Sequence, residues 1–377
     1  MDFNFSADQI ALKKMAQELV AKEITPYVHE MDEKSEMRPG LIQKFHNAGI
    51  LNLVVPEEYD GPGLDALSIA LIYEELGKGC AGVATSAAAN ALASYPVLVA
   101  GTDEQKRKMF DALNDGKLAA FALTEPNAGS DAGGVATSAV KDGEYYVLNG
   151  TKCFITNGGI SDVYTVFANA RKSAGIRGLT AFIVDRDTPG FSVGKKEDKM
   201  GMRPSNTTEL ILDNVRVHEG MRIGREGEGF KIAMKTLDAA RPLVGAVAVG
   251  LADAALQAAC KYAKERQQFG KPIASFQLVQ GMIADMVMAV ETARLMVYKA
   301  CWLKDQGQDY KLESAMAKCL SADVAMKVTT DAVQVMGGYG YMKEYPVEKM
   351  MRDAKLLQIY EGTNQIQRLV IANSVLY

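Results

Sequence analysis

The spacing of apolar residues changes twice along this chain, and that change limits the possible folds more than any other feature of the sequence. Residues 1–118 carry apolar side chains at intervals of three and four, residues 119–225 alternate at intervals of two, and residues 226–377 return to the longer interval. The longer interval is typical of amphipathic helices and the shorter one of strands. The sequence therefore predicts an α+β multidomain protein with an N-terminal helical domain, a middle antiparallel β domain and a C-terminal four-helix bundle.

Local signals refine this prediction. Residues 6–9 and 102–105 have the sequence of capping boxes, in which a hydroxyl and a glutamine satisfy free amides where a helix begins. Asp142-Gly143 and Asn149-Gly150 are dipeptides that favour tight turns between strands. Pro242, within a long helical pattern, indicates a kink or a new helix start. The helices of the bundle are expected at residues 230–266, 276–306, 312–336 and 346 to the C-terminus.

Composition and charge narrow the class of protein. The net charge is -4 and the basic residues are dispersed, so the sequence offers no basic face for nucleic acid. No apolar run approaches the roughly 20 residues that span a bilayer, and the first residues lack the pattern of a secretory signal. Five scattered cysteines without a C-x-x-C pair favour a reducing compartment, so we expect a cytoplasmic protein. The three histidines have no partner at ligand spacing, and no metal site is predicted.

Two groups of glycines require interpretation. Gly224, Gly227 and Gly229 precede a helical pattern, but their spacing is not that of a dinucleotide-binding fingerprint. Strands and helices do not alternate, which also disfavours a doubly wound nucleotide-binding sheet. The second group, at residues 337–341, fits either a helix stop followed by a flexible turn or a binding loop.

Six stretches together identify a family resemblance. They are FALTEPNAGSDAGG at 121–134, LNGTKCFITNGG at 148–159, KMGMRPSNTTELILDNVRV at 199–217, ERQQFGKPIASFQ at 265–277, QVMGGYGY at 334–341 and IYEGTNQIQR at 359–368. In this order and spacing the chain resembles the acyl-CoA dehydrogenase family, in particular its short- and medium-chain, butyryl-CoA dehydrogenase-like members. The resemblance covers nearly the whole chain and implies the same three-part architecture. It also implies FAD as cofactor and a homotetramer built as a dimer of dimers.

The resemblance assigns the central chemistry to Glu361. In the family, the residue at this position removes a proton from the α-carbon of an acyl-CoA thioester while a hydride leaves the β-carbon for FAD. Some members carry the base at the position of Ala240, which has no proton-accepting group here. Burial in an apolar cleft would raise the pKa of Glu361 and make it a stronger base. Without the resemblance, Glu361 would equally fit a helix-terminal acid followed by a glycine cap.

The resemblance also implies which residues bind FAD. Hydroxyl and aromatic side chains in the middle region are expected around the flavin ring, with Phe154 at the ring edge where many members have tryptophan. Arg266 and Gln268 are expected at the pyrophosphate, in the family on a flavin seated mainly in the adjacent subunit. The complete implied set is Thr124, Ser130, Phe154, Thr156, Arg266, Gln268, Phe269, Gln334, Gly337, Gly338, Thr363 and Gln365.

Substrate contacts are implied in the same way, at Ser130, Asp238, Arg241, Tyr360 and Gly362. The acyl pocket of the family is partly formed by the helix that corresponds to residues 82–96. Its small residues are compatible with a deep or wide pocket, and the stretch contains no arginine that would neutralise a dicarboxylate. The expected substrate is therefore a monocarboxylic short- to medium-chain or cyclic acyl group. The small residues in question are Ala84, Ala87, Ala88 and Ala91.

Other functions stay open on the sequence alone. The expected electron acceptor is an electron-transferring flavoprotein, but the same site could reduce an enoyl-CoA in the reverse direction. An oxidase is disfavoured by the chain length, because acyl-CoA oxidases usually carry a further C-terminal region. A helical interaction protein that keeps the fold without its chemistry is the alternative outside enzymes.

Overall fold

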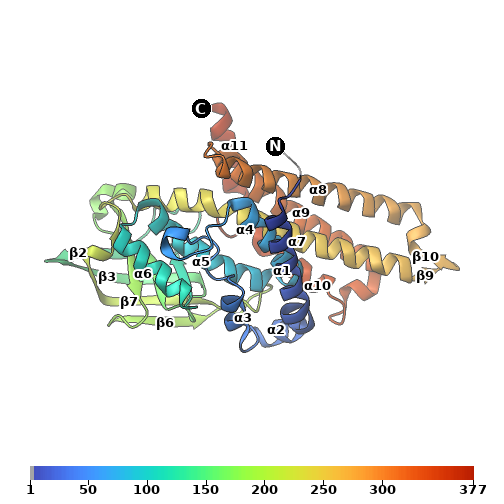
Figure 1. Cartoon of the computed structure of the whole chain (residues 1–377), viewed down its shortest axis with the longest axis horizontal. Coiled ribbons are helices and arrows are strands. Elements are labelled where there is room, and N and C mark those ends of the chain that lie inside the picture. Colours follow the sequence, from blue (N-terminus) through green and yellow to red (C-terminus); the bar gives the residue numbers. More distant parts are fainter. Residues whose placement is uncertain (1–3) are drawn as a thin grey trace.

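The computed structural model describes residues 4–377 and confirms the predicted α+β architecture (Figure 1). Six α-helices precede the sheet within the described residues, and α1 and α6 begin at the predicted capping boxes, Ser6 with Gln9 and Thr102 with Gln105. The helices are α1 (Ala7–Leu19), α2 (Val28–Lys34), α3 (Leu41–Asn47), α4 (Ala66–Gly79), α5 (Ala81–Ala100) and α6 (Asp103–Asn114).

The middle region forms one sheet with the strand order β6-β7-β3-β2-β4-β5-β8, and β1 lies beside β4. Most pairs are antiparallel as predicted, but β1 pairs with β4 in parallel and a single β2–β4 contact is also parallel. The strands are β1 (Ala119–Ala122), β2 (Ser138–Asp142), β3 (Tyr145–Thr156), β4 (Val163–Asn169), β5 (Leu179–Asp185), β6 (Phe191–Lys196), β7 (Thr207–His218) and β8 (Arg222–Ile223).

Of the two predicted turns in the sheet, one is confirmed and one is wrong. Gly143 has φ +62° in the tight connection between β2 and β3. Asn149-Gly150, in contrast, lies inside β3, where the register with β7 shifts between Leu148 and Gly150. A Cβ on Gly150 would stand 2.3 Å from the Oγ1 atom of Thr137. Glycine is therefore required here by a bulge and a close chain approach rather than by a turn.

The C-terminal region consists of α7 (Gly229–Glu265), α8 (Gln277–Asp305), α9 (Lys311–Met336), α10 (Val347–Leu357) and α11 (Asn364–Leu376). A short hairpin of β9 (Gln267–Gln268) and β10 (Lys271–Pro272) connects α7 to α8. The prediction of a single helix from 346 to the C-terminus is wrong, because the chain leaves the helix between Leu357 and Asn364.

Pro242 does not begin a new helix, because α7 continues through it. Proline cannot donate to the carbonyl four residues earlier, which here belongs to Asp238. The hydroxyl of Ser314, on α9, donates a hydrogen bond of 2.7 Å to that carbonyl. The neighbouring helix therefore satisfies the group that the proline leaves free.

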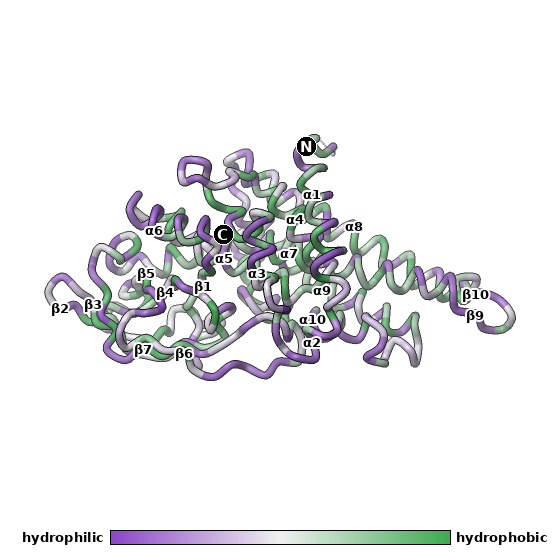
Figure 2. The backbone as a smooth tube through the Cα atoms, turned by 60° about the horizontal axis from the view of Figure 1, so that its bottom comes forward, coloured by the Kyte–Doolittle hydropathy of each residue, from purple (hydrophilic) through white to green (hydrophobic). Residues whose placement is uncertain are grey.

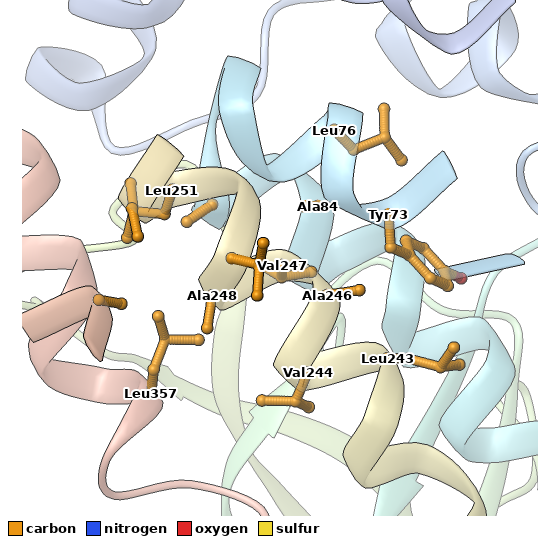
Figure 3. Packing of buried hydrophobic residues seen from close by; sticks show 14 of the residues in the cluster. Tyr73, Leu76, Ala84, Leu243, Val244, Ala246, Val247, Ala248, Leu251 and Leu357 are labelled. Carbon is orange, nitrogen blue, oxygen red and sulfur yellow. The ribbon is translucent and has the colours of Figure 1, made fainter. Parts of the chain in front are cut away.

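The main core surrounds α7, which packs against α4, α5 and α9 (Figure 3). Tyr73 and Leu76 of α4 belong to the same buried cluster as a run of residues on α7 that includes Val247 and Leu251. The contact between α4 and α7 is close, since a Cβ on Gly250 would stand 2.0 Å from the carbonyl oxygen of Glu74. Glycine at this crossing lets the two backbones meet.

Two core helices, α5 and α7, are long and apolar enough to span a bilayer by length and composition alone. The expectation that no segment approaches this length is therefore wrong for these helices. In both, 72% of the most apolar window is buried inside the protein. Figure 2 shows α5 and α7 surrounded by other helices and strands of the chain. Their apolar side chains are covered as in the core helices of soluble proteins.

Candidate active site

Glu361 lies in the short loop between α10 and α11, in an unusual backbone conformation. Its φ is +51°, in the left-handed region that residues with a side chain seldom adopt, and the following Gly362 has φ +87°. The hydroxyl of Thr363 accepts a hydrogen bond from the amide of Ile366 and begins α11. Glu361 is therefore not a residue of a helix end but the centre of a sharp turn.

Polar side chains of α9 and α11 hold this turn. Lys318 Nζ donates to the carbonyl of Gly362 at 2.7 Å, and Gln367 Nε2 donates to the same oxygen at 3.1 Å. Asp323 accepts hydrogen bonds from Gln358 at 2.6 Å and from Asn364 at 2.8 Å. The sequence motif pointed to Glu361 and its neighbours but predicted neither the turn nor these supports. Lys318 and Asp323 gave only a weak signal, as charged residues within the largely apolar pattern of α9.

The environment of the Glu361 carboxyl group makes it a base near neutral pH. The residue is partly exposed as a whole, but its Oε2 atom is buried and has no hydrogen-bond partner within the described chain. Burial raises the pKa of Glu361 to about 7, against the opposing charges of Lys318 and Arg241. A carboxylate with this pKa is a stronger proton acceptor than a solvated one and is still substantially ionised at pH 7.

The neighbours of Glu361 come from three parts of the fold. Tyr360 OH lies 3.2 Å from the hydroxyl of Thr85 on α5. Arg241 on α7 is 3% exposed, forms an ion pair with Asp238 at 2.5 Å, and keeps its Nε without a partner within the described chain. The predicted substrate residues Asp238, Arg241, Tyr360 and Gly362 therefore gather at one place, where α5, α7 and the turn meet.

The sheet residues predicted beside the flavin ring also lie together. The amide of Cys153 donates to the carbonyl of Thr124 at 3.0 Å, so the end of β1 lies beside the end of β3. Phe154 has φ +57° and is 64% exposed, which leaves an aromatic face free for a ligand. Thr156 is partly buried, and Ser130 is exposed.

Helix α5 connects this sheet edge to the Glu361 turn. The side chain of Asn157, directly after β3, donates to the carbonyl of Ser86 at 2.8 Å. The adjacent Thr85 contacts Tyr360, as described above. A single stretch of α5 thus touches both the predicted flavin edge and the loop of the predicted base.

A second group of predicted cofactor residues lines a cavity of about 450 Å³ at the other end of the bundle. Arg266 stands over the ring of Tyr339 at 5.5 Å. A Cβ on Gly338 would meet no atom within 4 Å, so its backbone is open to a ligand. The predicted residues in the lining are Arg266, Gln268, Gly337 and Gly338.

The remaining predicted cofactor residues lie outside that cavity. Phe269 is 91% exposed at the tip of the β9–β10 hairpin, again with a left-handed φ of +52°. Gln334 and Gln365 are exposed. Figures 1 and 2 show the hairpin at the end of α7 and α8 remote from the sheet. The structure therefore divides the predicted FAD residues into two groups that one chain does not bring together.

A larger cavity of about 650 Å³ lies near Glu361. Asp238 and Ala239 of α7 line it, together with Tyr95 of α5. The hydroxyl of Tyr95 accepts a hydrogen bond from Lys304 at 3.2 Å. Three lysines (Lys235, Lys304 and Lys311) and two further aspartates (Asp305 and Asp309) also contribute to the lining, so the cavity combines apolar walls with charged groups of both signs.

Comparisons with known proteins agree with this geometry. Family profiles described as the N-terminal, middle and C-terminal domains of acyl-CoA dehydrogenase match residues 6–117, 120–215 and 227–376. The chain belongs to the acyl-CoA dehydrogenase family. It is an enzyme of this family, which oxidises acyl-CoA thioesters, and its cofactor is FAD.

Similar proteins cover the full length of the chain. The short-chain specific acyl-CoA dehydrogenase of Clostridium acetobutylicum is 46% identical, with 100% of both chains covered. The structure of butyryl-CoA dehydrogenase from Megasphaera elsdenii is 48% identical, with a TM-score of 0.98 and 100% of both chains covered. A solved structure from a study of the electron transferring flavoprotein of Acidaminococcus fermentans is 49% identical to this chain, with the same TM-score and coverage.

Two further relatives bear on the alternative functions. An NADH-dependent acryloyl-CoA reductase of Anaerotignum propionicum is 44% identical over 100% of this chain and 96% of its own. A prolyl acyl carrier protein oxidase is 34% identical, with a TM-score of 0.95, and covers 99% of this chain and 100% of its own. Chain length therefore does not separate dehydrogenases from oxidases in this fold, and the length argument against an oxidase does not hold.

Proposed function

We propose that this enzyme dehydrogenates a short- to medium-chain or cyclic acyl-CoA and that Glu361 removes the α-proton. The observation that carries the proposal is the buried Oε2 of Glu361 on a left-handed turn, which has no hydrogen-bond partner among residues 4–377 and belongs to a carboxyl group with a pKa of about 7. In the reaction the proton of the α-carbon passes to the Glu361 carboxylate, and the electron pair of that C–H bond becomes part of the new double bond. FAD, when bound, supplies the oxidation by accepting the hydride from the β-carbon.

The thioester requires a polar site because its carbonyl oxygen gains negative charge as the α-proton leaves. The Glu361 turn has its backbone amides beside the carboxyl group that removes the proton, and Arg241 adds a buried positive charge close by. We assign the thioester to this place. Ser130 and Tyr360 would border it from the sheet side and from the turn.

We place the remainder of the CoA in the larger cavity near Glu361. Asp238 and the lysines of its lining offer a hydrogen-bond acceptor and cations for the phosphate groups. Of the alanines expected in the acyl pocket, Ala84, Ala87 and Ala91 are at most 3% exposed and pack in the core. Because these alanines are packed in the core, little space is left beside them for a long acyl chain. This supports the shorter acyl chains, in agreement with the names of the similar proteins.

The FAD site requires a second copy of the chain. Thr124, Phe154 and Thr156 lie beside the Glu361 region, whereas Arg266 and Gly338 line a cavity at the opposite end of the bundle. We propose that the Arg266 end of one chain covers the flavin bound mainly by its neighbour, in a dimer that pairs into a tetramer. The exposed Phe269 and Leu278, 91% and 87% accessible, lie at this end and would be covered in such a dimer.

Arg266→Gln should weaken both FAD binding and the dimer. A charged hydrogen bond to a phosphate contributes about 1.5–3 kcal/mol, so we expect FAD affinity to fall about 10- to 100-fold. Flavin fluorescence on dilution measures this affinity, and sedimentation measures the oligomer. Lys264→Gln, at an exposed position near the end of α7 and two residues before Arg266, is the matched control. Unchanged FAD retention in Arg266→Gln would contradict the shared site.

The electron acceptor we propose is an electron-transferring flavoprotein, supported by the similar structure described with that protein. The likeness to an acryloyl-CoA reductase favours a second candidate, the reduction of a short enoyl-CoA by the same site run in reverse. We propose the cytoplasm as the location, since all five cysteines are free.

One experiment tests the cofactor, the reaction and the substrate together. The purified protein should be yellow, and its flavin absorbance should bleach without oxygen when an acyl-CoA is added. We expect rapid bleaching with butyryl-CoA, slower bleaching with octanoyl-CoA and little with palmitoyl-CoA or glutaryl-CoA. No bleaching with any acyl-CoA would refute the dehydrogenase, and fastest bleaching with glutaryl-CoA would refute the substrate class. Reoxidation by crotonyl-CoA measures the reverse direction.

A further inference from the structure

We infer that Lys318 is a positioning residue for the reaction, which holds the turn that aims Glu361 at its substrate. The inference rests on the proposed role of Glu361 as the base. Lys318 lies on α9, 43 positions before Glu361 in the sequence, and no motif pointed to it.

The burial of Lys318 is unusual for a lysine. Its side chain is 0% exposed. Within the described chain no carboxylate oxygen lies within 4.0 Å of its Nζ atom, whereas the other two most buried lysines, Lys152 and Lys349, each have a carboxylate at ion-pair distance. Burial of a cation without such a partner costs free energy. The ammonium group instead donates to the carbonyl of Gly362 at 2.7 Å and to Oδ1 of Asn364 at 3.0 Å.

These two hydrogen bonds act on the most strained part of the turn. A non-glycine residue in the left-handed region costs about 1–2 kcal/mol, and contacts from outside the turn have to compensate. Lys318 binds the carbonyl directly after Glu361 and also the first residue of α11. Asn364 is fixed in turn by the carbonyl of Cys319 at 3.0 Å. Lys318 therefore connects α9 to the two points that directly follow Glu361, the Gly362 carbonyl and the start of α11.

The charge of Lys318 gives a second effect, which a merely structural contact would not have. The titratable groups that face Glu361 are Lys318 of α9, Arg241 of α7, Tyr95 of α5 and the adjacent Tyr360. Burial raises the pKa of Glu361 to about 7. The positive charges of Lys318 and Arg241 oppose this rise, and the effect of Lys318 is the larger of the two. Burial also lowers the pKa of Lys318 itself, to about 8, with Glu361 opposing. Without Lys318 only Arg241 would oppose the rise in Glu361.

The test compares pH profiles of kcat for butyryl-CoA. In the unmodified enzyme kcat should rise with pH through about 7, because the ionised form of Glu361 is the active one. Lys318→Met should move this midpoint measurably upward, because the charge that lowers the pKa of Glu361 is removed. It should also lower kcat at pH 7 about 10-fold or more, because the turn is no longer held. KM should change less than kcat, since Lys318 does not touch the substrate. Lys327→Met, which removes a half-exposed lysine from the same helix, should leave the profile unchanged.

Two more variants keep the inference testable if Lys318→Met does not fold. Lys318→Gln retains a donor for the Gly362 carbonyl but removes the charge, so it should shift the pH midpoint with a smaller loss of kcat. Lys318→Arg retains the charge and should keep the midpoint near 7. A midpoint and kcat equal to those of the unmodified enzyme in Lys318→Gln would overturn the inference, whether or not Lys318→Met folds.

The outcome for Lys318 can be separated from the outcome for the proposed function. If Glu361→Gln is inactive but the Lys318 variants behave as the unmodified enzyme, only the role of Lys318 is wrong. If Glu361→Gln remains active, the proposed base itself is wrong. The flavin absorbance spectrum of each variant shows independently that the cofactor site is intact.

Discussion

Glu361→Gln is expected to lower turnover of acyl-CoA by on the order of 10⁴-fold while FAD stays bound. The amide has the shape of the carboxylate but cannot accept the α-proton. Ala240, the alternative position of the base in the family, offers no substitute. Anaerobic bleaching of the flavin by butyryl-CoA measures the loss. Glu18→Gln, which makes the same change at a residue 72% exposed on α1, is the control and should be fully active.

The same substitution should stabilise the folded protein at high pH. The pKa of Glu361 is about 7 in the folded chain and 4.5 for the free side chain. A raised pKa means that the folded state loses stability as pH rises from 4.5 through 7, by on the order of 3 kcal/mol in total. Glu361→Gln removes this loss. Urea unfolding at pH 8 should show the variant more stable than the unmodified protein, and at pH 4 the difference should disappear. Equal stability at pH 8 would mean that the carboxyl group is solvated.

The parts of the fold that depend on local pattern could be predicted from the sequence. The three segments, both capping boxes and the turn at Gly143 follow from residues close together in the chain. Where a prediction failed, the deciding contacts come from distant residues. Of the two alternatives at Pro242, the new helix start is wrong, and Ser314 of α9 satisfies the carbonyl that the proline leaves free within α7. Asn149-Gly150 is not a turn, and the glycine is needed because Thr137 leaves no room for a Cβ in this strand.

The site shows the same division. The family motif pointed to Glu361, and the apolar spacing on both sides of it continues so regularly that one helix was expected. The turn is held from α9 by Lys318, which donates to the Gly362 carbonyl, and by Asp323, which accepts from the side chain of Gln358. Gln367 of α11 adds a hydrogen bond to the same carbonyl. No pattern within residues 346–377 could show the contacts that come from α9. The separation of Arg266 from the sheet likewise became visible only in three dimensions, and it is this separation that supports a site shared by two chains.

Lys152→Met is expected to destabilise the protein by about 3–5 kcal/mol, because it leaves a buried carboxylate without its partner. Lys152 is 0% exposed, and its Nζ lies 2.7 Å from Glu125 Oε1 and 3.1 Å from the carbonyl of Leu123. Glu125 also accepts hydrogen bonds from the amides of Ala136 and Thr137, at 2.7 and 3.0 Å. Burial alone would raise the pKa of Glu125, but Lys152 and these hydrogen bonds hold it below its usual value.

A matched surface pair separates the effect of burial from the effect of charge. Lys141 and Glu219 lie 2.9 Å apart in the same region of the fold but are 52% and 43% exposed. Lys141→Met should cost less than about 1 kcal/mol, since water screens exposed pairs. Urea unfolding of both variants gives the comparison. If Lys152→Met costs no more than Lys141→Met, the Glu125 carboxylate must be hydrated or protonated after the substitution.

The double variant Glu125→Gln with Lys152→Met tests whether the buried pair serves the flavin edge rather than stability. Removing both charges should recover most of the lost stability, because no unpaired ion remains. Lys152 lies two residues before Phe154, and Glu125 follows Thr124, so the pair fixes the two strand ends on which the flavin ring would rest. We expect the double variant to fold well and still release FAD faster than the unmodified protein. A double variant that recovers stability and FAD affinity together would show that the ion pair does not position these residues.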